Sequence, residues 1–225
     1  MTTSSDLALH EQLLLLALHD EKGTMHTWLF GYAAAAAILV ELIDRGRVGV
    51  ETAKAHAILN ATDTSPTGQA LLDDVLKQIA NVPRALPVES WITSIAATAG
   101  LQDRIADGLC QRGILARTEG RVLWVFSRKT YPTADAAPEQ ALVAALNAEL
   151  TGTAPLTPHG ALLLALGSET NILQHVFGGA VLNAQRNRIN EAIRLDTLGA
   201  AQKDVARAAL AAISNVKTAA IAGAM

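Results

Sequence analysis

The stretch WLFGYAAAAAILVELIDRGRV, from Trp28 to Val48, constrains the fold more than any other part of the sequence. Its uncharged part begins at residue 24 and ends where Glu41 and Asp44 introduce carboxylates, short of the about 20 apolar residues that a membrane span needs. Alanine has the highest helix propensity and a small side chain. The five consecutive alanines therefore predict a core helix from Tyr32 to Asp44 that neighbouring helices can approach closely.

Length and composition allow such a helix to be buried. The chain has 225 residues, half of them hydrophobic, which is enough for a sizeable core in one large domain or two intimate ones. The formal net charge is −3, so the chain as a whole has no basic excess for nucleic acid, and any anion site must be local. The single cysteine, Cys110, excludes an internal disulfide and suits a reducing compartment. Because no Lys or Arg precedes the first apolar run, we expect no signal peptide and a cytoplasmic protein.

Capping signals mark the predicted helix ends. Ser4 and Ser5 precede a leucine-rich first helix, and Gly46 follows the alanine helix where a left-handed residue commonly ends one. Ser65 and Pro66 fit a cap and a first helical position, so they predict that another helix starts there. Further helices are predicted from apolar residues at helical spacing within residues 71–79, 91–95, 101–112, 142–146, 162–166, 186–195 and 205–216.

After Gly113 the apolar residues change from helical spacing to a strand-like pattern, which predicts a β-hairpin. Its first strand is expected at residues 114–115 and its second at residues 122–126. The polar segment 117–121 between them is expected to form the turn, with Glu119-Gly120 at the tip.

These elements together predict the fold class. Residues 48–50 add a short extended stretch after the alanine helix. The sequence therefore predicts a mainly α fold, a single globular multi-helix domain over residues 1–225 with a buried Ala-rich central helix and one or two small β-hairpins.

No group of residues has the spacing typical of a catalytic or metal site. His10 and Glu11 begin like the zinc helix H-E-x-x-H, but the second ligand position holds Leu14, which cannot bind a metal. Cys110 has no neighbouring motif that would activate its thiol, so we expect a structural role. We therefore expect no enzyme, no metal and no cofactor. The remaining histidines follow no ligand spacing and are interpreted as surface or hydrogen-bonded core residues: His19, His26, His56, His159 and His175.

Several segments occur in an order that matches one family. They are LLLLALHDEKG from Leu13, ELIDRGRV from Glu41, SPTG from Ser65 with LLDDVLK behind it, Trp91-Ile92, and RGIL from Arg112 with the apolar segment 123–126. In these segments and their spacing the chain resembles the Golgi phosphoprotein 3 family, including its bacterial members, over nearly its whole length. The resemblance implies a mostly helical domain.

The resemblance also implies a function. Eukaryotic members bind phosphatidylinositol 4-phosphate on Golgi membranes and sort membrane enzymes by gripping their cytosolic tails, as adaptors and not as enzymes. Trp28 matches the tryptophan of the family's head-group pocket, but the first of the pocket's arginines falls on Ala35 and the other two fall near Ala99 and Gln102. Since each hydrogen bond to a charged group contributes about 1.5 to 3 kcal/mol, we do not expect a phosphoinositide site of the same design.

Two sets of candidate site residues follow from the resemblance. The head-group candidates are Trp28, Gln102 and Arg104, although Trp28 is equally interpretable as a core aromatic. The family hairpin takes part in membrane contact or self-association, and here a charged predicted tip favours self-association or packing on the helices. The hairpin candidates are Leu115, Arg117, Arg121, Trp124 and Phe126.

Two functions of different classes remain open. The first is a peripheral membrane-associated binding module on the inner face of a membrane, whose partner is an anionic lipid head group or a membrane-protein tail. The alternative is a soluble oligomeric scaffold or regulatory protein that has kept the fold and lost lipid binding. Both include self-association, and neither includes nucleic acid.

Overall fold

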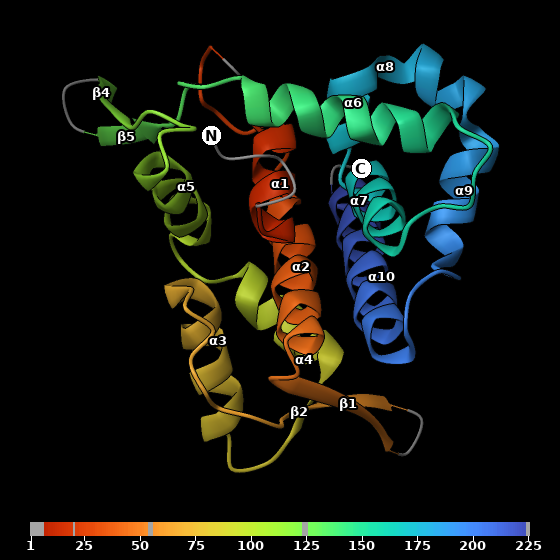
Figure 1. The fold of residues 1–225 in the computed structure, drawn as a ribbon. Helices are drawn as coiled ribbons and strands as arrows, with labels where there is room; N and C mark the ends of the chain where they lie inside the picture. The colour runs from red at the N-terminus through yellow and green to blue at the C-terminus, as the bar shows by residue number, and fades with distance from the viewer. Residues whose placement is uncertain (1–6, 20, 54–55, 123–125, 224–225) are drawn as a thin grey trace.

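Helix α2 (Phe30–Asp44) lies at the centre of the molecule and packs against α1 (Leu9–Ala17), α4 (Val88–Ala96) and α10 (Ala200–Ala222) (Figure 1). The structure is a computed structural model that describes residues 7–19, 21–53, 56–122 and 126–223. All five alanines of α2 are 0% exposed. The predicted core helix is therefore confirmed, and it begins two residues earlier than predicted.

The described residues form a mainly α fold, as predicted. The other helices are α3 (Ala70–Asn81), α5 (Leu101–Gln111), α6 (Ala137–Thr151), α7 (Pro158–Glu169), α8 (Ile172–Ala184) and α9 (Arg186–Arg194). The strands are β1 (Val48–Ala53), β2 (His56–Ala61), β3 (Leu86–Pro87), β4 (Thr118–Val122) and β5 (Phe126–Thr130). Buried side chains from α1 to α10 join in one hydrophobic core, with α7 buried almost from end to end.

The strands form two small antiparallel sheets, as the sequence predicts. In the first, β2 lies between β1 and β3, with Val48 opposite Ala61 and Leu59 opposite Leu86. Leu59 is fully buried and anchors this sheet to α3 and α4. The second sheet is the β4–β5 hairpin.

Helix ends follow the predicted signals in one case and not in another. Gly46 is left-handed at φ +66°, and its N–H donates to the Ile43 carbonyl at 2.9 Å, which ends α2 as predicted. The predicted start of α3 at Ser65-Pro66 is wrong, because α3 begins at Ala70. Asp63 accepts hydrogen bonds from the Ser65 N–H and hydroxyl at 2.8 and 2.6 Å, so Ser65 belongs to a turn instead of capping the helix. Ser4 and Ser5 lie outside the described residues.

The predicted register of the β4–β5 hairpin is also wrong. Thr118 pairs with Thr130 and Val122 with Phe126, so the predicted turn residues 117–121 lie largely in the first strand, and the connection falls on residues 123–125. Glu119 opposite Lys129 gives the ladder a pair of opposite charges. Leu115 is not part of the hairpin strands: it is 3% exposed and bridges Thr133 at the hairpin's base.

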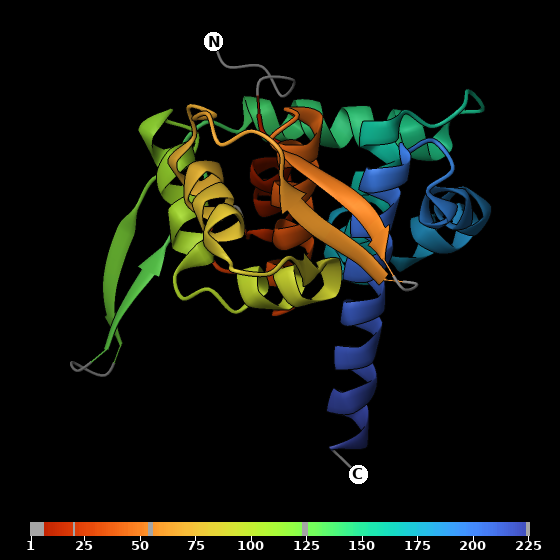
Figure 2. The ribbon, with the colours of Figure 1, turned by 90° about the horizontal axis from the view of Figure 1, so that it is seen from below.

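Two elements project from the helical body. The β4–β5 hairpin and the C-terminal end of α10 extend in the same direction (Figure 2). Among the helices in the described ranges, α10 alone is long and apolar enough to cross a bilayer by length and composition. Its first half is a core element, with Val205, Ala209 and Ile213 fully buried, so length and composition are weak evidence for a span.

Candidate functional site

Trp28 is the most prominent exposed aromatic residue among those whose side chains are described, with 65% of its surface accessible. Its neighbours Leu29 and Phe30 are 2% and 4% exposed and fix the start of α2 in the core. The Thr27 hydroxyl accepts a hydrogen bond from the Leu29 N–H at 3.2 Å, which forms a tight turn at this point. The buried Leu29 and Phe30 on one side and the turn at Thr27 on the other hold the Trp28 side chain outward. The alternative that Trp28 is a core aromatic is therefore wrong.

A hollow of about 350 Å³ lies beside Trp28. It opens where α2 approaches α4 so closely at Gly31 that an added Cβ would lie 2.8 Å from the Ala96 carbonyl oxygen. Gln102 lines the same hollow, so the structure brings these two head-group candidates together. The lining residues are Met25, Thr27, Trp28, Phe30, Gly31, Ala96, Thr98, Gly100, Leu101, Gln102 and Asp103.

The first turn of α5 forms one wall of this hollow. Gly100, left-handed at φ +72°, turns the chain from α4 into α5. Asp103 accepts a hydrogen bond from the Tyr131 hydroxyl at 2.8 Å and pairs with Lys129 at 3.2 Å. Burial, followed by the hydrogen bond to Asp103, raises the pKa of Tyr131 far above its usual value, so the phenol stays protonated and donates. This contact joins the hollow to the base of the hairpin.

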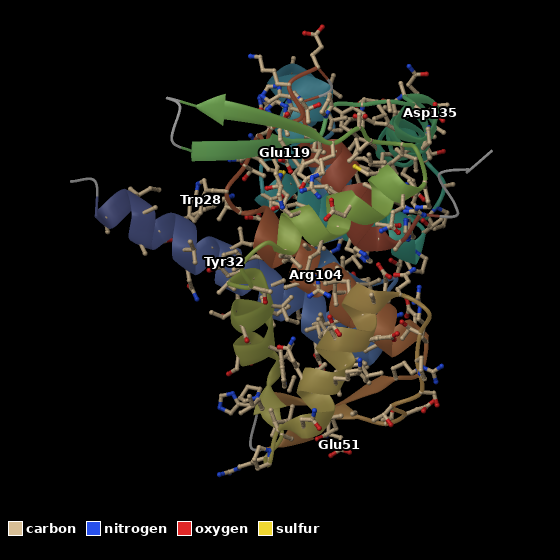
Figure 3. The ribbon with its side chains drawn as sticks, turned by 90° about the vertical axis from the view of Figure 1, so that its left-hand side faces the viewer. Trp28, Tyr32, Glu51, Arg104, Glu119 and Asp135 are labelled. Carbon is tan, nitrogen blue, oxygen red and sulfur yellow. The ribbon has the colours of Figure 1, made fainter. Side chains whose placement is uncertain are left out.

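The arginines near α2 and α5 form ion pairs with acidic residues outside the hollow. Arg104, the third head-group candidate, does not line the hollow and instead pairs with Asp74 on α3 at 2.6 Å (Figure 3). Arg45 pairs with Glu41 at 3.7 Å, and Arg47 pairs with Asp63. The one charged residue among the described lining residues is Asp103. The hollow therefore lacks the cluster of cations that a phosphate group needs.

The positions that correspond to the family's arginines differ in exposure. Ala35 is completely buried in α2, whereas Ala99 is exposed in the turn before α5. Only Gln102 contributes a polar side chain to the hollow from these positions. An arginine at Ala35 would have no path to solvent in this packing.

The two hairpin candidates whose side chains are described differ in exposure, because Leu115 is buried and Arg117 is exposed. Arg117 donates to Glu119 at 2.7 Å, and this hydrogen bond, chiefly, raises the pKa of the guanidinium. Arg121 and Phe126 belong to the strand ladder, opposite Ser127 and Val122. Trp124 lies outside the described residues. Because the connection between the strands carries Leu123-Trp124-Val125, the sequence at that end of the hairpin is apolar and not charged as predicted.

Three projecting features lie on one side of the molecule. Figure 3 shows Trp28 between the β4–β5 hairpin and the end of α10, with all three directed to the same side. Ile221, near the end of α10, is 67% exposed, and residues 218–222 carry no charge. We call Trp28, the β4–β5 hairpin and residues 214–222 of α10 the docking face. Ile221 was not among the residues predicted from the sequence, although the uncharged TAAIA that ends an amphipathic helix is a signal for it.

The fold also brings together three histidines from separate parts of the sequence. One ring nitrogen from each of His19, His26 and His175 lies within 4.8 Å of the others.

Cys110 is half-buried, and burial, followed by Asp107, raises the pKa of its thiol, which agrees with the expected structural role. His10 and Glu11 are engaged separately, His10 with Glu41 at 2.8 Å and Glu11 with Arg112.

Comparison with known proteins gives the family. A model of the Golgi phosphoprotein 3 (GPP34) family matches residues 9–213, from the start of α1 to the last fully buried turn of α10. Vacuolar protein sorting-associated protein 74 from Schizosaccharomyces pombe is 30% identical over 149 residues, which are 57% of this chain and 44% of that protein. The alignment thus spans less than half of the relative's length. Because the family model covers nearly every element of the fold, the chain belongs to the Golgi phosphoprotein 3 family.

Proposed function

We propose that this protein is a peripheral membrane-binding module that rests on a bilayer through the docking face. The observation that carries the proposal is the outward, 65% exposed Trp28, which lies between the projecting hairpin and the end of α10 that carries the 67% exposed Ile221. Indole rings favour the membrane interface, where one part of the ring is apolar and the N–H stays hydrated. Membership of the Golgi phosphoprotein 3 family supports the same function.

The docking face has the composition of an interfacial surface more than that of a head-group pocket. The end of α10 has one charged residue after Asp204 and Arg207, and this residue, Lys217, lies 3.5 Å from Glu169. The hollow beside Trp28 is lined by an acidic residue and no basic one among the described residues. We therefore infer that apolar insertion drives binding and that phosphatidylinositol 4-phosphate is not selected by an arginine pocket.

The size of the Trp28 contribution follows from its exposed area. Burying on the order of 130 Å² of indole at about 25 cal/mol per Å² contributes about 3 kcal/mol, or about a hundredfold in partition coefficient. The 67% exposed Ile221 adds to this. A single truncation at Trp28 is therefore expected to be measurable without removing the rest of the surface.

Liposome flotation tests the proposal. We expect Trp28→Ala to lower the partition coefficient of the full chain by at least about tenfold, because it removes the largest exposed apolar side chain of the docking face. The thermal midpoint should stay within about 1 °C of wild type, because the side chain is mostly exposed. Vesicles are phosphatidylcholine alone, with phosphatidylserine, and with phosphatidylinositol 4-phosphate.

Leu86→Ala is the matched control for this experiment. Leu86 is also an exposed large apolar residue, at 38%, but it lies on the three-stranded sheet and not on the docking face. Flotation of this variant should equal that of wild type. If wild-type protein stays in the soluble fraction with all three vesicle types, membrane docking is excluded. A strict requirement for phosphatidylinositol 4-phosphate would contradict the inferred apolar mode and restore a head-group site.

A second candidate, a self-associating scaffold, is favoured by the same lack of a cationic pocket. The docking face would then be covered by another copy of the chain. Light scattering after size-exclusion chromatography separates the two functions. A wild-type dimer that Trp28→Ala or Ile221→Ser converts to monomer, together with no flotation, would assign the face to self-association. A monomer that floats would assign it to the membrane.

A further inference from the structure

Three histidines meet where the connection between α1 and α2 reaches α8. The ring centroids of His19 and His26 are 3.2 Å apart, and those of His26 and His175 are 3.0 Å apart. One nitrogen from each ring lies within 4.8 Å of the other two. His175 is separated from His26 by most of the chain, so the fold and not a local motif creates this cluster.

The backbone holds His19 and His26 on one face of a short antiparallel ladder. Leu18 is bridged to Met25, the His19 N–H donates to the Thr24 carbonyl at 2.9 Å, and the His26 N–H donates to the Ala17 carbonyl at 2.9 Å. Side chains alternate between the two faces of such a ladder. His19 and His26 are therefore diagonal neighbours on the same face, at a spacing that lets long side chains touch.

The third imidazole comes from the first turn of α8. Ile172 and Leu173 are fully buried and fix this turn against the core, while His175, at the end of the same turn, is exposed. Helix α8 also packs against α1. A rigid helix turn thus presents His175 to the two histidines of the ladder.

The three rings lie in direct contact. Aromatic pairs usually settle with centroids about 4.5 to 7 Å apart, which is wider than both short distances here. A divalent ion can hold such a cluster together, because one nitrogen of each imidazole can bind to a common centre.

We propose that His19, His26 and His175 form a binding site for a zinc ion. Imidazole nitrogen suits zinc and its borderline neighbours, and zinc sites with three histidines leave a fourth position to water. Zn–N bonds of about 2.0 to 2.1 Å in a tetrahedral site place the nitrogens about 3.3 Å apart and the ring centroids about 5 Å apart. On binding the ion, the His26 ring therefore turns away from its two neighbours while one nitrogen of each ring moves toward the common centre. The ion ties the α1–α2 connection to α8 and fixes the segment that carries Trp28, two residues after His26.

Zinc binding to the full, untagged chain, previously treated with a chelator, tests the site. Isothermal titration with zinc chloride at pH 7.5 should show one ion per chain. His26→Ala and His175→Ala should each weaken binding by at least a hundredfold. His56→Ala, which removes an exposed histidine on β2, should leave binding unchanged and controls for adventitious surface coordination. X-ray absorption should show about three imidazole nitrogens at about 2.0 to 2.1 Å.

Thermal unfolding separates loss of the site from loss of the fold. Without zinc, His175→Ala should unfold at the wild-type temperature, because its side chain is exposed. With excess zinc, the midpoint should rise for wild type and for His56→Ala but not for His175→Ala. Wild-type affinity no tighter than that of His175→Ala, or equal loss in His56→Ala, would overturn the proposal. This outcome would leave the membrane proposal intact, since flotation is measured separately.

Discussion

Ala35→Arg should prevent the chain from folding. Ala35 is 0% exposed at the centre of α2, and the packing around it leaves no room for a long side chain. The substitution would overfill the core and bury a guanidinium without a carboxylate partner, at a cost of at least about 5 kcal/mol. Since a native domain is stable by about 5 to 15 kcal/mol, we expect insoluble or unfolded protein in circular dichroism and thermal scans.

Ala99→Arg is the control that makes this result specific. It introduces the same side chain at an exposed position near the hollow, where a second family arginine falls. This variant should fold with a thermal midpoint within about 2 °C of wild type. A folded and stable Ala35→Arg protein that gains affinity for phosphatidylinositol 4-phosphate would contradict the prediction and show that the head-group site survives in α2.

Gly23→Ala should lower the thermal midpoint by about 10 °C. Gly23 is left-handed at φ +57°, and an added Cβ would overlap the backbone of Tyr131 and Pro132. The Tyr131 N–H donates to the Gly23 carbonyl at 2.9 Å, so the two segments cannot separate without losing this bond. Strain and overpacking together cost about 3 kcal/mol, and about 2 to 4 °C is lost per kcal/mol in a chain of this size.

Gly46→Ala separates the cost of backbone strain from the cost of overpacking. Gly46 has a similar φ of +66°, but an added Cβ there meets nothing within 4 Å. It should therefore cost only the backbone strain, about 1 kcal/mol. Differential scanning calorimetry of both variants tests the prediction. Equal losses in Gly23→Ala and Gly46→Ala would mean that the contact with Tyr131 and Pro132 carries no energy.

The sequence predicted those parts of the fold whose signals are local. The alanine run is both strongly helical and too short for a span, which led to a core helix, and Gly46 ends it by a bond within the same turn. The helix start predicted at Ser65 was wrong because the Ser65 N–H and hydroxyl donate to Asp63, two residues earlier. The predicted hairpin strands were out of register because Ile114 and Leu115 fill the core instead of starting the first strand.

The candidate site was predicted only in part for the same reason. The family resemblance drew attention to Trp28 and Gln102, which line one hollow, but the partner of Arg104 is on another helix and could not be read from spacing. Ile221 and the three histidines depend on how α8 and α10 pack against the rest of the chain. Their placement is tertiary information that no local pattern carries.

Insertion of the docking face into the bilayer is tested most directly by measuring the depth of spin labels. The chain has one cysteine, so Cys110→Ala provides a background for single labels. Sites are Trp28→Cys and Ile221→Cys on the docking face, and Asp135→Cys on the other side of the molecule in Figure 3.

On vesicles, the labels at Trp28 and Ile221 should become accessible to oxygen and protected from a polar nickel reagent, while the label at Asp135 stays in water. Trp28→Cys alone will bind more weakly, so it is measured at saturating lipid. Labels at Trp28 and Ile221 that remain in water on vesicle-bound protein would contradict insertion of the docking face.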